Sequence, residues 1–280
     1  MNYASIEGFM RILIIQFSGT GNTSAIANIL CDEFQVHQET CEFIPMEDIL
    51  QARISPNYSD WDIIGIGFPV HAMDAPIIVY DFLKTLPAMR KDYFLFKTAG
   101  SSFASAGSTF RIRDSMAKLG YRLKHEQLYV MPPNSFGTAK PAKVEKRYEK
   151  CIVLARQSAS EILAGIRNKI ADPPLRGLLY AFAGLEKYGA VQSSKHWKVN
   201  SDCTSCGLCA KQCPTQNITL ENGNIRFADD CLLCLRCWWN CPVRAISHSF
   251  LKPFFLREPY QLPDYKQIQD KEHLYNKDTL

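Results

Sequence analysis

The first 165 residues alternate between short apolar runs and amphipathic stretches. Continuous apolar runs are typical of strands buried on both faces of a sheet, and a stripe of apolar positions at helical spacing is typical of surface helices. The expected strands lie at residues 11–17, 62–67 and 93–99, with weaker strands near 41–44 and 123–131. The expected helices lie at residues 24–34, 77–86, 108–119 and 141–170. This alternation predicts an α/β fold with a doubly wound, five-stranded parallel sheet.

Three loops directly follow strands of the predicted sheet. The first reads S-G-T-G-N-T at residues 18–23 and leads into a helix, so its backbone amides, hydroxyls and helix N-terminus suit a phosphate group. It contains no lysine and matches neither G-x-x-x-x-G-K nor G-x-G-x-x-G. The other two loops lie at residues 68–76 and 98–102. Ligands of open α/β sheets bind at the carboxyl ends of strands, so we expect one site formed by these loops.

Eight of the eleven cysteines form two copies of the spacing C-x2-C-x2-C-x3-C-P. This run holds [4Fe–4S] clusters in bacterial two-cluster ferredoxins, where the fourth cysteine of each copy binds the other cluster. The motif therefore implies two metal-ligand sets. One set is Cys203, Cys206, Cys209 and Cys241, and the other is Cys231, Cys234, Cys237 and Cys213.

Two other uses of clustered cysteines fit this chain less well. Disulfide frameworks belong to small secreted proteins, whereas these cysteines occupy the last third of a 280-residue chain that shows no secretory leader. Structural zinc sites prefer paired C-x2-C units at longer separations. The pattern therefore favours two iron–sulfur clusters.

Composition restricts the setting in which the protein works. The chain is 46% hydrophobic and 21% charged with a net charge of +4, which is typical of globular proteins and does not indicate nucleic-acid binding. Its longest apolar runs are far too short to span a bilayer. We expect a cytoplasmic protein with no transmembrane segment and no nucleic-acid partner.

The phosphate-type loop resembles a known motif. The FMN phosphate loop of flavodoxins reads T-x-T-G-x-T; here Ser18 replaces the first Thr, while Thr20, Gly21 and Thr23 match. Joined to the cysteine motif, the whole chain resembles the EFR1-type ferredoxin family, in which a flavodoxin-like domain is fused to a bacterial 2[4Fe–4S] ferredoxin domain.

The resemblance implies FMN as a second cofactor and assigns residues to it. The loop at the first strand would bind the FMN phosphate through Ser18, Thr20, Gly21, Asn22 and Thr23. The isoalloxazine would be bordered by Phe68, Pro69, Val70, His71, Thr98, Ala99, Gly100 and Ser101. Flavodoxins place an aromatic residue against the ring, and Phe103 or Phe68 is the candidate here.

These observations divide the chain into four parts. We expect a flavodoxin-like FMN-binding domain at residues 1–166, a basic helical linker at 167–198, a 2[4Fe–4S] ferredoxin-type domain at 199–250 and an extended C-terminal tail at 251–280. The linker carries six Lys or Arg against two acidic residues. Its helix is expected at residues 175–190.

Three functions agree with this organisation. The leading one is electron transfer between two [4Fe–4S] clusters, FMN and an external redox partner, either a protein or a small-molecule electron acceptor. An FMN-dependent reductase of a small organic substrate, fed by the clusters, is the first alternative. A redox-sensing accessory subunit is the second. No side chain is predicted to act as a catalytic acid, base or nucleophile.

Overall fold

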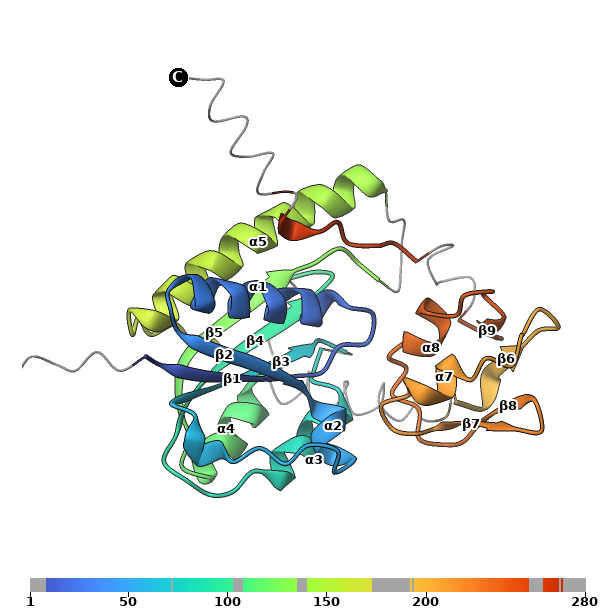
Figure 1. Cartoon of the computed structure of the whole chain (residues 1–280), viewed down its shortest axis with the longest axis horizontal. Coiled ribbons are helices and arrows are strands. Elements are labelled where there is room, and N and C mark those ends of the chain that lie inside the picture. The colour runs from blue at the N-terminus through green and yellow to red at the C-terminus, as the bar shows by residue number, and fades with distance from the viewer. Residues whose placement is uncertain are drawn as a thin grey trace, which may run out of the picture.

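The computed structural model describes residues 9–71, 73–102, 108–134, 140–172, 192, 194–251, 259–266 and 268. Two units stand side by side along the long axis of the molecule, a larger α/β domain and a smaller unit that contains the cysteine motif (Figure 1). The smaller unit sits beyond one end of the sheet strands, and α8 lies on the side of it that faces the sheet (Figure 1).

The larger domain is built on one parallel sheet of five strands. In chain order the strands are β1 Arg11–Gln16, β2 Thr40–Pro45, β3 Ile63–Pro69, β4 Asp92–Ala99 and β5 Arg122–Val130. They lie side by side in the order β2-β1-β3-β4-β5, and every neighbouring pair is parallel. This is the strand order of flavodoxin-like folds, so the predicted fold class is confirmed.

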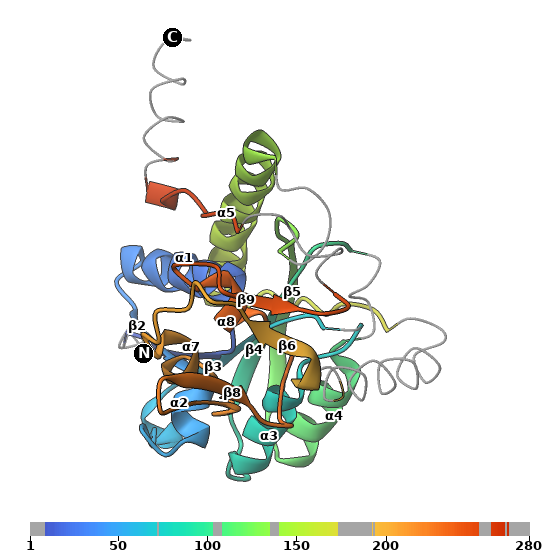
Figure 2. The ribbon, with the colours of Figure 1, turned by 90° about the vertical axis from the view of Figure 1, so that its right-hand side faces the viewer.

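Helices cover both faces of the sheet (Figures 1 and 2). One face is covered by α1 Asn22–Val36 and α5 Pro141–Leu163. The opposite face is covered by α2 Met46–Leu50, α3 Ile77–Thr85 and α4 Phe110–Lys118. A short 3-10 helix lies at Tyr58–Asp60. Covering both faces explains why the strand sequences are continuous apolar runs rather than alternating ones.

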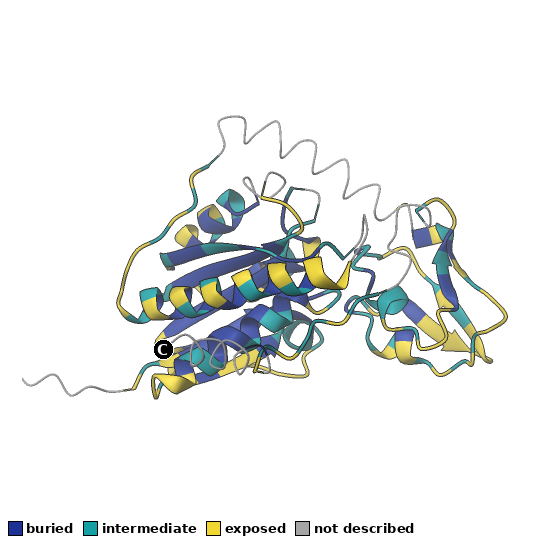
Figure 3. Cartoon of the chain, turned by 90° about the horizontal axis from the view of Figure 1, so that it is seen from above, coloured by how far each residue is buried: buried dark blue, intermediate teal, exposed yellow. Residues whose placement is uncertain are grey.

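The sheet is buried on both faces, and its packing requires glycine on β3. Residues 12–15 of β1 are fully buried, and Figure 3 shows the strands as the most buried layer of the domain. A Cβ atom on Gly65 would lie 2.3 Å from the Phe94 ring, and one on Gly67 would lie 2.0 Å from the Phe96 ring. Two phenylalanine rings of β4 therefore fill the space that side chains on β3 would need.

The smaller unit is made of short strands and one-turn helices. Its elements are η3 Ser194–His196, β6 Trp197–Val199, α7 Leu208–Lys211, β7 Ile218–Glu221, β8 Asn224–Phe227, α8 Arg236–Trp239 and β9 Ile246–His248. Two antiparallel pairs, β6 with β9 and β7 with β8, flank the two helices. A small core of its own includes Trp197, Ile218, Leu235 and Ile246.

The element boundaries differ from the expected ones in a few places. The last helix ends at Leu163 rather than near residue 170, and the short helix α2 had no clear signal in the sequence. The helix expected at 175–190 lies outside the described residues. Trp197 and Lys198 pair with β9, so we propose that the small domain begins at residue 194 and not at 199. None of the described helices is long and apolar enough to cross a membrane.

Part of the expected C-terminal tail is packed against the larger domain. Residues 259–266 run beside α5 and α1 (Figure 1). Ile268 is 5% exposed and belongs to the core on that face, while the Tyr265 hydroxyl donates a hydrogen bond to the Asp32 carboxylate of α1. Residues 259–264 are extended, whereas residues 265, 266 and 268 are helical, and the segment is held by contacts rather than projecting into solvent.

Candidate functional site

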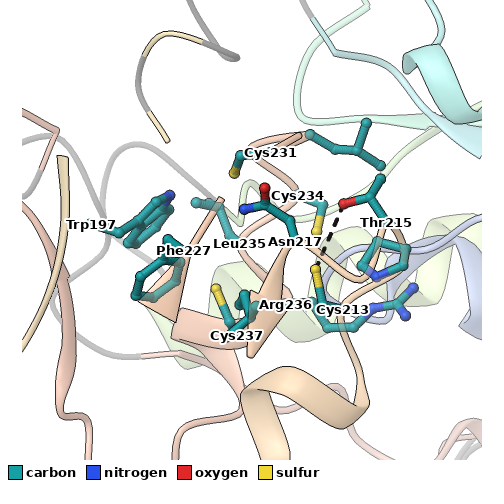
Figure 4. Close-up of a pocket in the computed structure, with 13 residues that line it drawn as sticks. Trp197, Cys213, Thr215, Asn217, Phe227, Cys231, Cys234, Leu235, Arg236 and Cys237 are labelled. Atoms are coloured by element: carbon teal, nitrogen blue, oxygen red, sulfur yellow. Dashed lines mark hydrogen bonds between the residues drawn. The ribbon is translucent and has the colours of Figure 1, made fainter. Parts of the chain in front are cut away.

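Two cavities in the smaller unit are each lined by four cysteines taken from both copies of the motif. The Cys213 cavity is lined by Cys213, Cys231, Cys234 and Cys237. Figure 4 shows these four side chains around one space. The Cys241 cavity is lined by Cys203, Cys206, Cys209 and Cys241. The structure thus groups the eight cysteines into the two sets that the motif implies.

Each cavity is lined by as many cysteines as one cubane cluster has iron atoms. Within the described part of the chain, no three His, Cys, Asp or Glu side chains converge closely enough to hold one metal ion. Four thiolates around a cubane bind four different iron atoms, so they lie farther apart than the ligands of a single zinc ion. Four cysteines around one cavity therefore match the donor set of a [4Fe–4S] cluster.

The two copies of the motif share an unusual backbone. Ser205 and Leu233 have φ angles of 54° and 51°, and Gly207 and Leu235 have φ angles of 70° and 63°. The third pair, Gln216 and Arg244, has φ angles of 55° and 51°. The two members of each pair are 28 positions apart, like Cys203 and Cys231. Left-handed φ is costly for residues other than glycine, so its repetition indicates that both loops are shaped for the same task.

Polar groups of the loops point at the cysteine sulfurs. The Leu233 amide donates to Cys231 Sγ and the Ala245 amide to Cys241 Sγ, each at 3.3 Å. Hydrogen bonds to ligand sulfurs stabilise the reduced, more negative state of a cluster. Burial raises the pKa of Cys234 to about 12 and the pKa of Cys237 well above its usual value. These cysteines therefore need bound cations nearby to become thiolates.

The phosphate-type loop lies where the sequence predicts it, between β1 and α1. Gly21 has a φ angle of 101°, which favours glycine, and its amide donates to Ser18 Oγ at 3.2 Å. The Thr23 hydroxyl lies 2.9 Å from that of Thr98, at the end of β4. Asn22 donates through Nδ2 to the Pro132 carbonyl at 3.0 Å. The loop is thus tied to the ends of β4 and β5 by hydrogen bonds within the chain.

The loops expected to border the isoalloxazine follow neighbouring strands. Because β1, β3 and β4 are adjacent, their carboxyl ends lie at one edge of the sheet. The Val70 amide donates to the Thr98 carbonyl at 2.8 Å, which joins the second and third loops. His71 and Asp74 exchange two backbone hydrogen bonds of 2.9 Å in a tight turn. Hydroxyls, backbone amides and a helix N-terminus at the same sheet edge as the other two loops suit a ligand such as FMN.

The two aromatic candidates for the flavin ring differ in status. Phe68 is fully buried within the core on the α3 side of the sheet, so its side chain is unavailable to stack on a bound ring. Phe103 lies outside the described residues. The expectation that Phe68 substitutes for the flavodoxin aromatic residue does not agree with its burial, because a strand residue inside a packed core has no free face.

Several residues around the phosphate-type loop carry no signal in the sequence. Asn134 donates to the Thr20 hydroxyl, and the Tyr260 hydroxyl lies 3.0 Å from Asn22 Oδ1 and 2.8 Å from the Pro132 carbonyl. An open cavity of about 460 Å³ beside the loop is lined by Thr20 and Gly21 together with residues of the C-terminal segment. No local pattern marks Asn134 or Tyr260, since both reach the loop from more than 110 positions away.

A buried group of charges also went unpredicted. Lys97 on β4 and Glu126 on β5 are both fully buried, with Lys97 Nζ 3.6 Å from Glu126 Oε1. Arg113 Nη1 of α4 lies 2.5 Å from Glu126 Oε2. Burial lowers the pKa of Lys97 to about 8, against the opposing effect of Glu126. Lys97 directly precedes Thr98 on β4, so the two side chains lie on opposite faces of the sheet. The buried charges therefore support the end of β4 from the face opposite to Thr98.

Comparison with known proteins identifies the smaller unit. Residues 197–219, which include the first copy of the motif, match the family model described as a 4Fe-4S binding domain. The chain is also similar to DNA-directed RNA polymerase subunit Rpo3 of Methanosarcina mazei, at 36% identity over 59 residues. That match covers 20% of this chain and only 22% of the polymerase subunit. The chain therefore carries a 4Fe–4S binding domain after a flavodoxin-like domain.

Solved structures resemble the larger domain at low identity. They include rubredoxin oxygen:oxidoreductase from Desulfovibrio gigas, with 18% identity over 55% of this chain and 36% of that one, and a TM-score of 0.39. A flavodoxin from the domain Archaea has 16% identity over 55% of this chain and 99% of its own, with a TM-score of 0.39. The two-electron-reduced flavodoxin of Megasphaera elsdenii has 20% identity over 53% and 98%, with a TM-score of 0.39. The fold class rests on the strand order rather than on these distant likenesses.

Proposed function

We propose that this chain transfers single electrons between two [4Fe–4S] clusters, a bound FMN and an external redox partner, as an EFR1-type ferredoxin. The observation that carries the proposal is the contact between the two cofactor sites. A Cβ atom on Gly19, in the phosphate-type loop, would lie 2.4 Å from the Cys234 carbonyl oxygen, so the two loops touch. A cluster passes one electron at a time, and FMN accepts one or two.

Placing both sites on one chain has a kinetic consequence. Transfer between tethered groups is intramolecular, with an effective concentration far above that of separate carriers. In this proposal the eight motif cysteines hold the clusters. Ser18, Thr20, Gly21, Asn22 and Thr23 hold the FMN phosphate, and the loops at residues 68–71 and 98–101 border the ring.

The test is anaerobic purification followed by iron, sulfide and FMN assays on the same sample. About eight iron atoms per chain are expected from two [4Fe–4S] clusters. Thr20→Ala should reduce FMN retention and leave the iron content unchanged, because Thr20 lies in the loop and not in the cysteine cavities. Thr85→Ala is the matched control, since among the described residues the Thr85 hydroxyl donates to the Phe82 carbonyl within α3.

Two results would overturn the proposal. Protein that contains no iron, or iron but no flavin released by acid, lacks one half of the electron path.

Stepwise reductive titration then separates the alternatives: a relay reduces several unrelated carriers, whereas a reductase shows saturable turnover of one small compound that is lost with FMN.

A further inference from the structure

The two cysteine cavities have unequal surroundings, although their loops repeat one backbone design. The Cys213 cavity lies against the larger domain. Leu232, which lines it, belongs to the core beneath α2 and α3, and Cys234 packs against the same core. The Pro214 carbonyl accepts a hydrogen bond of 2.7 Å from Gln51 Nε2. Three lining residues thus contact the larger domain directly.

Arg236, at the start of α8, joins this cavity to the phosphate-type loop. Its Nη2 donates to the Ser18 carbonyl at 2.6 Å, and its Nη1 lies 2.6 Å from Glu47 Oε1 on α2. The guanidinium also lies over the Phe17 ring, 5.6 Å from its centroid. Its side chain is 16% exposed. A planar guanidinium with two charge-assisted bonds and a ring contact fixes orientation better than a flexible cation.

The equivalent positions of the first copy face away from the larger domain. Leu208 lies 28 residues before Arg236, and Thr204 lies 28 residues before Leu232. Both residues are exposed. Leu208 is 39% exposed and Val243 is 38% exposed, and both line the Cys241 cavity. For the described residues that line this cavity, the hydrogen bonds observed stay within the smaller unit. Cys206 is itself exposed.

We propose that the Cys213 cavity holds the inner cluster, which exchanges electrons with the flavin, and that the Cys241 cavity holds the outer cluster, which meets external one-electron carriers. Arg236 is the positioning residue that keeps the inner site against the phosphate-type loop. This inference rests on the proposed function and adds the order of its centres to it. Electron tunnelling slows steeply with distance, so the site in contact with residues 18–19 has the faster route.

The electron count along this route is simple. A one-electron donor is oxidised by one electron as the outer site is reduced by one. Transfer of that electron to the inner site would reoxidise the outer site and reduce the inner one, and its transfer to the flavin would reoxidise the inner site. No covalent bond forms or breaks between the two iron sites. Two passages with two donors supply the electron pair that full reduction of a flavin takes up, with protons from water.

The decisive variant is Arg236→Gln in the anaerobic full-length protein. A photochemically generated one-electron donor reduces the clusters, and flavin absorbance reports the internal step. We expect this step to slow severalfold, while reduction of the outer cluster and the iron content stay unchanged. Arg226→Gln is the matched control, because it removes the same charge from an exposed ion pair with Glu221 on the far hairpin.

Two readouts do not depend on electron-transfer activity. Loss of the Arg236 charge should lower the midpoint potential of the inner cluster and leave the potential of the outer cluster unchanged. The reason is that a nearby cation stabilises the more negative reduced state of a cluster. Amide hydrogen exchange in residues 18–21 should accelerate, because the Ser18 carbonyl loses its partner. Equal shifts of both cluster potentials, or equal effects of Arg226→Gln, would overturn the assignment of inner and outer sites.

If the Arg236→Gln protein lacks iron, a second variant tests the assignment of inner and outer sites. Gly19→Ala places a methyl group 2.4 Å from the Cys234 carbonyl and must push the two loops apart. It should slow the internal step with both clusters present. An unchanged rate of electron transfer to the flavin in Gly19→Ala would contradict this inference alone. Wild-type protein without iron or FMN would contradict the proposed function itself.

Discussion

Single glycines carry three different structural requirements in this protein. Gly21 adopts a left-handed φ of 101° that turns the chain into α1. Gly19 allows the Cys234 loop to approach, and Gly67 leaves room for the Phe96 ring. Sequence alone marks all three as breaks in an apolar pattern. Only the packing partners distinguish a turn from a close contact, and those partners lie far away in the chain.

Gly67→Ala should destabilise the larger domain. The added methyl group would lie 2.0 Å from the Phe96 ring inside a packed core. Overpacking of this kind costs about 1–3 kcal/mol of unfolding free energy. Thermal unfolding under anaerobic conditions should show a midpoint several degrees lower. Gly100→Ala is the control, since its Cβ would meet Pro133 at 3.4 Å, an ordinary contact. A Gly67→Ala midpoint equal to that of Gly100→Ala would contradict the packing account.

At the scale of elements, the apolar pattern predicts the strands of the sheet but not the helix α2 or the buried charges that support them. All five strands were predictable because strands buried on both faces have continuous apolar sequences. The helix α2 was missed because five residues are too few to show helical periodicity. Lys97 was read as a strand residue because the apolar run continues around it. The Glu126 carboxylate offsets part of the cost of burying the Lys97 charge, and the Thr109 hydroxyl accepts a hydrogen bond from Lys97. No local pattern connects either residue to Lys97.

The Lys97 group predicts a stability that depends on pH. Burial lowers the pKa of Lys97 to about 8, below its unfolded value of 10.5, so the unfolded state binds more protons between these values. Stability from this group therefore rises with pH, by about 2 kcal/mol between pH 7.5 and 9.5. Lys97→Met should lack this rise. Thermal midpoints of both proteins at the two pH values give the comparison, and parallel changes would show that Lys97 does not titrate in this range.

The C-terminal segment makes a second prediction at this scale. Tyr260 contacts Asn22 and the Pro132 carbonyl beside the phosphate-type loop, whereas Tyr265 of the same segment bonds Asp32 farther along α1. Tyr260→Phe should weaken FMN binding by about 1 kcal/mol, the usual net value of a buried hydrogen bond. Tyr265→Phe should leave FMN affinity unchanged. Fluorescence titration of FMN into flavin-free protein measures both, and equal losses would point to a general effect of the segment.

At the scale of the whole molecule, the cysteine spacing was the most informative part of the sequence. Three ligands of each set follow from local spacing, and the exchange of the fourth cysteine follows from the use of this motif in two-cluster ferredoxins. The docking of the smaller unit does not follow from it. Arg236 and Glu47 are 189 positions apart, and neither stands in a recognisable pattern. Such long-range contacts depend on the assembled fold, which explains why the contact between the two sites required the structure.

The exchange of cysteines between the two copies predicts a specific pattern of iron loss. Cys213 belongs to the first copy but lines the cavity of the second, and Cys241 does the reverse. Cys213→Ala should therefore disable the same cluster as Cys231→Ala, and iron should fall from about eight to about four atoms per chain. The double variant Cys213→Ala with Cys231→Ala should lose no more iron than either single one.

The contrasting double variant makes this test decisive. Cys213→Ala combined with Cys203→Ala removes one ligand from each cavity and should leave neither cluster intact. Electron paramagnetic resonance of the dithionite-reduced proteins identifies which signal each variant keeps. If each cluster instead took all four ligands from its own copy, Cys213→Ala with Cys203→Ala would keep half of the iron and Cys213→Ala with Cys231→Ala would lose all of it. The two models thus predict opposite results for the same pair of proteins.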